Sequence, residues 1–219
     1  MHIDILYHDN HLLAANKPPD LLTQPSGTDR DNLEDQAKAW VKAEFAKPGA
    51  VFLEAVHRID SPVSGVVLFG RTSKALTRMN AAIRERRVRK QYLAIVRGRL
   101  PKDSDTLVNH LRHDDHQATV VPAGTKGAAE ARLHYRVLHR GSGSVLVEID
   151  LETGRYHQIR VQLAAIDCPI LGDTRYGGPE WRNPGIALHH RRLSVPHPTR
   201  PDTIVIDAPE PPGWRRVLN

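Results

Sequence analysis

The sequence is poor in cysteine, in aromatic residues and in long apolar runs. Its one cysteine, Cys168, cannot form an internal disulfide, so we expect a reducing compartment of the cytoplasmic type. No run approaches the roughly 18 consecutive apolar residues that a membrane-spanning helix needs. The N-terminal stretch MHIDILYHDN lacks the basic and apolar regions of a signal peptide. The sequence therefore predicts a cytoplasmic protein with no membrane partner.

The chain is long enough for a core of its own. Apolar residues make up 40% of its 219 residues, which argues against a disordered chain. At roughly 150 residues per domain, this length predicts one large domain or two closely associated ones. Such a chain buries a core without metal ions or disulfides.

Basic residues are concentrated in one part of the chain. Residues 71–99 contain ten Lys or Arg and one acidic residue, while the rest of the chain has 21 basic and 24 acidic residues. The net charge of +6 is therefore a segment of +9 within a slightly acidic protein. Such a segment indicates a polyanionic partner, with nucleic acid first, although a solvated helix face is an alternative explanation.

The pattern of apolar residues predicts more strands than helices. Two short apolar runs, 3–7 and 11–17, indicate a β-hairpin. Helices are predicted over 31–46, with Asp31 as the cap, and over 73–88 and 155–166. Further strands are predicted over 51–56, 66–69, 90–97, 131–138, 144–151, 186–195 and 203–208. The polar segment 101–127 reads as loops with a short strand or two. Because strands and helices do not alternate regularly, the α+β class is expected.

Two segments carry candidate chemistry. In His57–Gly65, Asp60 lies in a turn rich in proline and glycine, and Arg58 would share its face on an extended chain. From the residues alone, an ordinary turn aspartate beside a surface arginine is the favoured explanation of this segment. In TGRYHQIR (153–160), Thr153 can cap a helix that brings His157 and Arg160 to one face, with Arg155 in the first turn. That face suits a phosphate or a carboxylate, and a solvated basic helix is the alternative.

Two other patterns are not interpreted as sites. The ligand-type side chains of His110, His113, Asp114, Asp115 and His116 have no second cluster at metal spacing, so no metal site is expected. Ser142 lies in a GSGS turn rather than between a strand and a helix, where a nucleophilic serine would be expected.

Six segments together resemble the motifs of the RluA-type family of RNA pseudouridine synthases, in the order of that family. They are NKP (16–18), HRID with SG (57–65), KQYLAIVRG (90–98), TGRYHQIR (153–160), CPILGD with Tyr176 (168–176), and Leu188-His189 with His197-Pro198. Each segment alone is a weak signal, but together they span nearly the whole chain. Three positions depart from the family pattern, since Asp20 replaces a glycine, Val63 a threonine and Gln162 a histidine.

The resemblance implies a fold and an activity. The implied fold is α+β, with a mixed, largely antiparallel central sheet, flanking helices and a central active-site cleft. The implied reaction isomerises uridine in RNA and needs no cofactor and no metal. No S4-type module precedes the first motif, so residues 1–219 are expected to form one catalytic domain that binds RNA by itself.

The resemblance also assigns roles to residues. Asp60 is the implied catalytic carboxylate, Arg160 its ion-pair partner, and Tyr92 the ring that packs on the target base and assists proton transfer at C5. Arg58 resembles the arginine that enters the RNA stack. RNA contacts are further expected from Arg84, Arg86, Arg87, Arg89, Lys90, Arg155 and His157.

The expected partner is ribosomal or transfer RNA, bound by a monomer that needs no protein partner. Two other functions are alternatives. One is a non-catalytic RNA chaperone that uses the same basic cleft. The other is a metal-dependent nuclease, for which the sequence lacks a ligand set.

Overall fold

The computed structural model describes residues 3–218, which contain eleven β-strands, three α-helices and two short 3-10 helices. The predominance of strands, without regular alternation with helices, confirms the predicted α+β class. The chain forms two compact units. Unit 1 comprises Met1–Arg89 with His190–Pro209, and unit 2 comprises Lys90–His189 with Glu210–Asn219. That the whole chain forms one catalytic domain stays a prediction. None of the described helices is long and apolar enough to cross a membrane.

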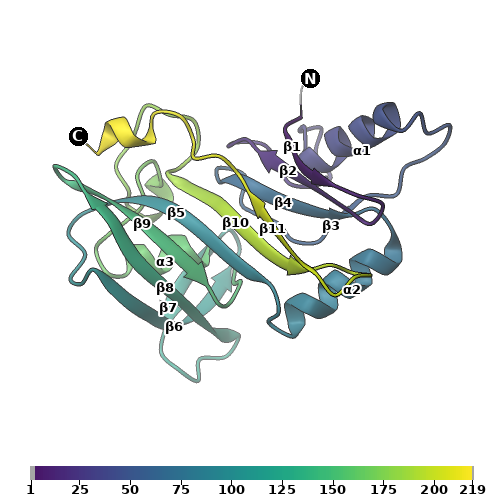
Figure 1. The fold of residues 1–219 in the computed structure, drawn as a ribbon. Coiled ribbons are helices and arrows are strands. Elements are labelled where there is room, and N and C mark those ends of the chain that lie inside the picture. The colour runs from purple at the N-terminus through teal and green to yellow at the C-terminus, as the bar shows by residue number, and fades with distance from the viewer. Residues whose placement is uncertain (1–2, 219) are drawn as a thin grey trace. The chain divides into compact units, whose positions relative to one another are not determined.

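Unit 1 is built on a sheet whose strands come from both ends of the chain (Figure 1). Its strands are β1 (Ile5–His8), β2 (Leu12–Lys17), β3 (Glu54–Ala55), β4 (Ser64–Gly70), β10 (Leu188–Pro196) and β11 (Thr203–Asp207). The order is β1-β2-β4-β10, with β3 also paired to β4 and β11 to β10. The predicted hairpin of the first two strands is confirmed, with antiparallel pairing such as Ile5 with Ala15.

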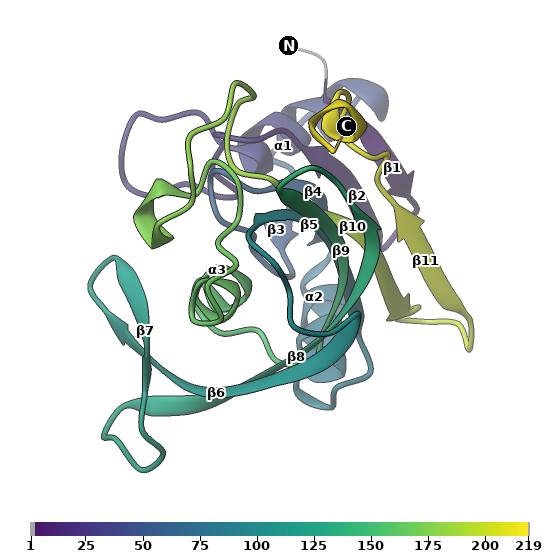
Figure 2. The ribbon, with the colours of Figure 1, turned by 90° about the vertical axis from the view of Figure 1, so that its left-hand side faces the viewer.

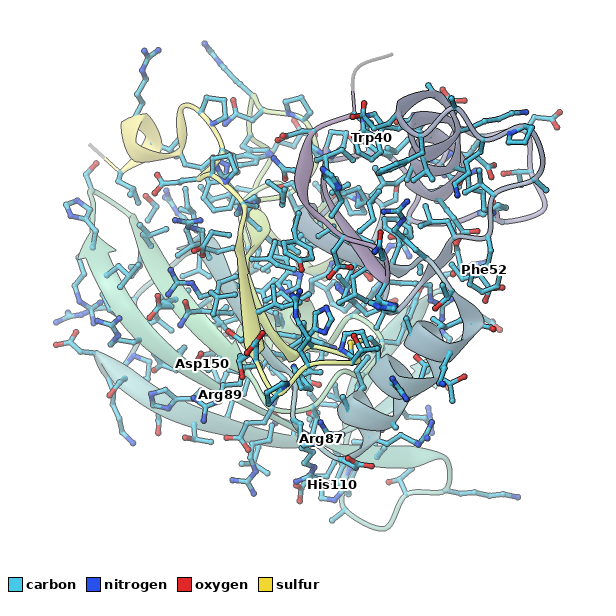
Figure 3. All side chains as sticks on the ribbon, turned by 45° about the vertical axis from the view of Figure 1, so that its right-hand side comes forward. Trp40, Phe52, Arg87, Arg89, His110 and Asp150 are labelled. Carbon is cyan, nitrogen blue, oxygen red and sulfur yellow. The ribbon has the colours of Figure 1, made fainter. Side chains whose placement is uncertain are left out.

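Two helices belong to this unit. Helix α1 (Leu33–Glu44) begins after Asn32, whose side chain accepts the Asp35 N–H at 2.9 Å, so the predicted cap at Asp31 is wrong by one residue. Its Trp40 ring, labelled in Figure 3, lies 5.4 Å from the His8 ring. Helix α2 (Ser73–Arg84) packs Ala75, Met79 and Ala82 into the apolar core formed with β2, β4, β10 and β11.

Helix α2 is shorter than the predicted 73–88. Arg86 has a φ of 56°, in the left-handed region, where an α-helix does not continue. Only Arg84 therefore lies in the last turn, where a cation favours the helix dipole. Arg86 and Arg87 lie in the connection to the next strand, and Arg89 is the first residue of that strand.

Unit 2 contains five strands in the order β5-β9-β8-β6-β7, all paired antiparallel. They are β5 (Arg89–Arg97), β6 (Ser104–Asp114), β7 (Gln117–Val121), β8 (Ala128–Arg140) and β9 (Ser144–Leu151). The prediction that 101–127 is mostly loop is wrong, because β6 and β7 occupy much of it. Both strands are largely solvated, so they lack the apolar alternation that marks a half-buried strand. Backbone pairing holds them, as in Leu107 with Leu133.

Helix α3 (Gln158–Ala164) lies on the concave side of β8, β6 and β7 (Figure 2). It is shorter than the predicted 155–166, since His157 has a left-handed φ of 52°. Its Val161 packs against Leu111, Ala118 and Ala131. The buried Gln162 amide donates to Asn109 Oδ1 at 2.8 Å and to two backbone carbonyls, which attaches the helix to the sheet.

The Asp9 carboxylate links the β1–β2 turn to the connection between β10 and β11 by hydrogen bonds. Asp9, in the β1–β2 turn, accepts hydrogen bonds from the His11 and Leu12 N–H groups, from the Tyr7 hydroxyl and from His197 Nε2, at 2.7–2.8 Å. His197 lies between β10 and β11. Burial of Asp9 acts to raise its pKa, but these hydrogen bonds outweigh it and hold the pKa well below its usual range.

We predict that Asp9→Asn lowers the free energy of unfolding by about 1.5–3 kcal/mol near neutral pH, because hydrogen bonds to a charged acceptor are removed. Since the folded pKa lies below the unfolded value of about 4, the contribution is present above that pH and is lost as the pH falls. Urea unfolding of both proteins at about pH 7 and about pH 3 measures this change. Replacement of the exposed Asp31 by Asn is the control. If the difference in free energy of unfolding between Asp9→Asn and wild type is the same at both pH values, the prediction is contradicted.

Candidate active site

Asp60 is half-buried in the turn that leads from β3 into β4. The Val63 N–H donates to the Asp60 carbonyl at 3.0 Å and closes the turn. Arg58 is exposed and Ile59 is buried, an alternation that an extended segment predicts. The buried Thr23 hydroxyl donates to the Ile59 carbonyl at 2.9 Å, so the segment is anchored on its inner side.

Only glycine fits at position 65, near the start of β4. Gly65 has a φ of 114°, and a Cβ there would lie 2.3 Å from the His190 carbonyl oxygen. The neighbouring His57 also faces this strand, since its ring lies edge-on to the His190 ring at 5.3 Å and its Nε2 accepts the Leu68 N–H at 3.2 Å. The HRID segment is thus fixed to β4 at its first residue.

A buried ammonium group holds the Asp60 turn to the end of β2. Lys17 is fully buried, and its Nζ donates to the carbonyls of Pro18, Leu21 and Ser61 at 2.9, 2.7 and 2.8 Å. Three carbonyl acceptors require three N–H donors, which only the protonated amine has. Lys17 therefore joins the NKP segment to the residue that follows Asp60.

The electrostatic surroundings of Lys17 include the candidate nucleophile. Burial lowers the pKa of Lys17 to about 7, while the nearby carboxylates of Asp20 and Asp60 act to raise it. Asp20 also donates its N–H to the Ser61 carbonyl at 2.8 Å. Its φ of 64° is left-handed, a conformation that glycine adopts freely and aspartate tolerates, which explains how Asp20 replaces the glycine of the family motif.

In unit 2, Arg160 forms a buried, two-pronged ion pair. Its Nε and Nη2 donate to the two carboxylate oxygens of Asp173 at 2.7 and 2.8 Å, and its guanidinium carbon lies 5.1 Å from the centre of the Tyr176 ring. Sequence reasoning did not single out Asp173, although this residue is the acid of the CPILGD segment. Asp60 belongs to unit 1 and Arg160 to unit 2, so their expected ion pair stays a prediction.

His157 is buried, in surroundings that favour the neutral form of its ring. Its Nδ1 accepts the Tyr176 hydroxyl at 2.8 Å, and that hydroxyl accepts the Ala118 N–H at 2.9 Å. Burial first, and then the charges of Arg160 and Arg175, lower the pKa of His157 to about 3. These contacts give His157 a packing role, and its expected contact with RNA stays a prediction.

The loop before α3 is fixed by side chains rather than by a helix cap. Thr153 does not cap the helix as predicted, because its hydroxyl accepts the Arg132 N–H and donates to Gln158 Oε1, both at 2.8 Å. Arg155 is exposed, outside the helix, and its Nε donates to the Glu130 carbonyl at 2.9 Å.

Tyr92 is buried on β5 and is paired in register with Ile149 on β9. Its ring thus comes from the first strand in the order of unit 2, next to β9. Its expected role on the target base stays a prediction.

The structure divides the basic segment into two kinds of residue. Arg84, Arg86, Arg87 and Arg89 are exposed at the connection between α2 and β5, where Figure 3 labels Arg87 and Arg89. We call these four residues the basic connection. Lys90, by contrast, is half-buried, and this burial lowers its pKa.

The His-rich segment of the sequence lies on the β6–β7 hairpin. There Arg112 forms an ion pair with Asp114 at 2.9 Å, and the His113 ring lies 4.0 Å from the ring of Tyr156. Within residues 3–218, no three His, Cys, Asp or Glu side chains converge closely enough to hold a metal ion.

Comparisons with known proteins agree with the motifs. The family model described as RNA pseudouridylate synthase matches residues 11–165. A relative from Synechocystis, called an uncharacterized RNA pseudouridine synthase, is 35% identical over 99% of this chain and 68% of its own length. The dual-specificity RNA pseudouridine synthase RluA of Haemophilus influenzae is 31% identical over 94% of this chain and 93% of its own.

Two further proteins are similar over most of this chain. The ribosomal large subunit pseudouridine synthase D of Nitrosomonas europaea is 32% identical over 99% of this chain, which spans 64% of that relative. The solved structure of human RNA pseudouridylate synthase domain containing 4 matches with a TM-score of 0.81 at 24% identity, covering 98% of this chain and 91% of that one. This structural likeness confirms the predicted fold. The matched family model and the near full-length relatives show that the chain belongs to the RluA-type family of RNA pseudouridine synthases.

Proposed function

We propose that this RNA pseudouridine synthase converts specific uridines of ribosomal RNA, transfer RNA or both, with Asp60 as the nucleophile. The observation that carries the proposal is the rigid turn that presents Asp60, which Lys17 fastens to the end of β2. Two relatives support the RNA class, since one is a dual-specificity RNA pseudouridine synthase and the other a ribosomal large subunit pseudouridine synthase.

In the proposed reaction the uracil base leaves and rejoins the same ribose. The bond between C1′ and N1 breaks while the Asp60 carboxylate stabilises or captures C1′. The base turns and C5 bonds to C1′. Where the carboxylate has bonded to C1′, that bond breaks in the same step and the carboxylate is released. The proton on C5 is then lost while N1 gains one. Atoms and electrons balance within the nucleotide and two proton transfers, so no oxidant or reductant is required.

Three other side chains serve the flipped nucleotide in this proposal. The ring of Tyr92 packs on the base, and its hydroxyl assists the proton transfer at C5. The exposed guanidinium of Arg58 stacks in the RNA and offsets part of the few kcal/mol that removing a base from the stack costs. Arg160, held by Asp173, supplies the positive charge for the catalytic carboxylate.

The first prediction concerns the nucleophile. Asp60→Asn keeps the size of the side chain but removes the carboxylate, so we expect pseudouridine formation to fall at least about 10³-fold while RNA is still bound. Wild type and variant are incubated with transcribed ribosomal and transfer RNA, and pseudouridine is mapped by position. The exposed Asp29→Asn is the matched control. Equal rates for wild type and Asp60→Asn would falsify the assignment, and RNA binding without conversion by wild type would favour the chaperone.

The second prediction concerns Lys17 as a positioning residue. Lys17→Met removes one donor from each of three carbonyls, of which only that of Ser61 keeps another donor among the described residues, the Asp20 N–H. The cost is about 1–3 kcal/mol for each carbonyl that stays buried without a donor. In the protein that remains folded, displacement of Asp60 is expected to lower kcat on the order of 10²-fold, with RNA affinity retained. The exposed Lys42→Met serves as control. A folded Lys17→Met with wild-type kcat would show that the ammonium group does not position the nucleophile.

The third prediction concerns the basic connection. Replacing Arg86, Arg87 and Arg89 with Gln is expected to weaken the binding of many RNAs alike. It should also reduce the slope of log affinity against log salt concentration, by about 0.7–0.9 for each RNA phosphate that the variant no longer neutralises. We call this slope the salt slope. The control removes the same charge from Arg136, Arg140 and Arg192, which all form ion pairs with carboxylates, whereas only Arg87 of the test set does so among the described residues. If both triple variants show the wild-type salt slope, the basic connection does not contact phosphate.

A further inference from the structure

Lys90 is a half-buried cation without an anion. It is the second residue of β5, and no hydrogen bond or ion pair to its side chain exists among residues 3–218. Other, exposed arginines differ, since Arg87 pairs with Glu85 at 2.6 Å and Arg136 with Glu148 at 2.7 Å. Taking a charge out of water without a partner costs free energy, so a residue of this kind calls for a compensating ligand.

The space next to the Lys90 amine is kept open by a glycine. A Cβ at Gly154 would lie 3.7 Å from Lys90 Nζ, and no other heavy atom of the described residues outside 153–155 would lie within 4 Å of it. Gly154 does not have a left-handed φ, so its backbone conformation does not require glycine. The evident effect of the missing side chain is therefore to leave the amine accessible from the Gly154 side.

The backbone at Gly154 is held in place on both sides. Thr153 and Arg155 are both fixed to Gln158 Oε1, by the Thr153 hydroxyl at 2.8 Å and the Arg155 N–H at 3.0 Å. Gln158 Nε2 in turn donates to the Arg132 carbonyl at 3.1 Å. The Gly154 N–H itself donates to no group within residues 3–218. An ammonium group and a backbone N–H on a rigid loop are the donors that a phosphate oxygen accepts.

The charged side chains near Gly154 leave positive charge available to an anion. Arg155 is exposed and has no carboxylate partner among the described residues, since its Nε donates to the Glu130 carbonyl. Glu152 lies 3.7 Å from the Arg132 guanidinium, and the Asp150 carboxylate accepts the Gln91 amide at 3.2 Å. The nearby acids are thus engaged with other groups, and the Lys90 amine is not.

We propose that Lys90 and the Gly154 backbone form a binding site for a single phosphodiester of the substrate RNA, distinct from the exposed basic connection. The inference rests on the proposed function, because an RNA substrate supplies the phosphate. The site holds one phosphate at a fixed place on the loop before α3. The basic connection, in contrast, provides exposed charge that any backbone phosphate can approach.

The test measures RNA affinity over a range of salt concentrations in the Asp60→Asn background, so that turnover does not intervene. We expect Lys90→Met to weaken binding about tenfold and to lower the salt slope by about 0.7–0.9, the amount that one neutralised phosphate contributes. Gly154→Ala is expected to weaken binding less than Gly154→Val, whose branched side chain covers the amine. The exposed Lys126→Met is the matched control and should bind as the background does.

Thermal unfolding separates this role from a structural one. Removing a buried cation without a partner should leave the melting temperature of RNA-free Lys90→Met unchanged or raise it, whereas removing a structural lysine would lower it. Wild-type affinity and salt slope in Lys90→Met, or equal binding by Gly154→Ala and Gly154→Val, would overturn the proposal. Failure of the wild-type enzyme to form pseudouridine would instead overturn the proposed function, so the two failures are distinguishable.

Discussion

The architecture of the candidate site depends on one buried ammonium group. Lys17 joins the end of β2 to the turn after Asp60 through three carbonyl acceptors, and no side-chain carboxylate takes part in these bonds. A buried charge is costly unless it is fully hydrogen-bonded, so the three carbonyls must stay where they are for the protein to be stable. The requirement that stabilises Lys17 therefore also fixes the backbone that presents Asp60, the proposed nucleophile. In this way a stability constraint on the first unit becomes a constraint on the geometry of catalysis.

The second unit holds its functional loop by a related use of side chains. Arg160 is fixed by both oxygens of Asp173, and Gln158 ties the Thr153–Arg155 backbone to β8. Arg160, Asp173 and Gln158 are buried and paired. Lys90 on β5 is half-buried, and its amine has no hydrogen bond or ion pair among the described residues. A protein that satisfies the polar groups around a loop but leaves one cation without a partner keeps that cation available to a ligand. The contrast between paired and unpaired charges thus separates the groups that support the loop from Lys90, which we propose as a ligand of RNA phosphate.

Much of the fold followed from the sequence because its signals are local. Apolar runs identified the strands of the core, and the motif segments identified the family. What the sequence could not provide were features set by single backbone angles or by distant partners. Arg86 and His157 end or delay helices through left-handed φ values that no periodicity reveals. Strands β6 and β7 are solvated and carry little apolar pattern. One hydrogen-bond partner of Lys17, Ser61, lies 44 residues away in the chain. The NKP motif therefore identified the lysine but could not predict its hydrogen bonds.

The central claim is that the carboxylate of Asp60 isomerises uridine in cellular RNA. The most direct measurement maps pseudouridine in total RNA from cells that lack this gene, and from the same cells complemented with wild type or with Asp60→Ala. The account predicts that defined positions in ribosomal or transfer RNA lose pseudouridine in the deletion strain and regain it with wild type but not with Asp60→Ala. Restoration of those positions by Asp60→Ala, or identical maps with and without the gene, would contradict it.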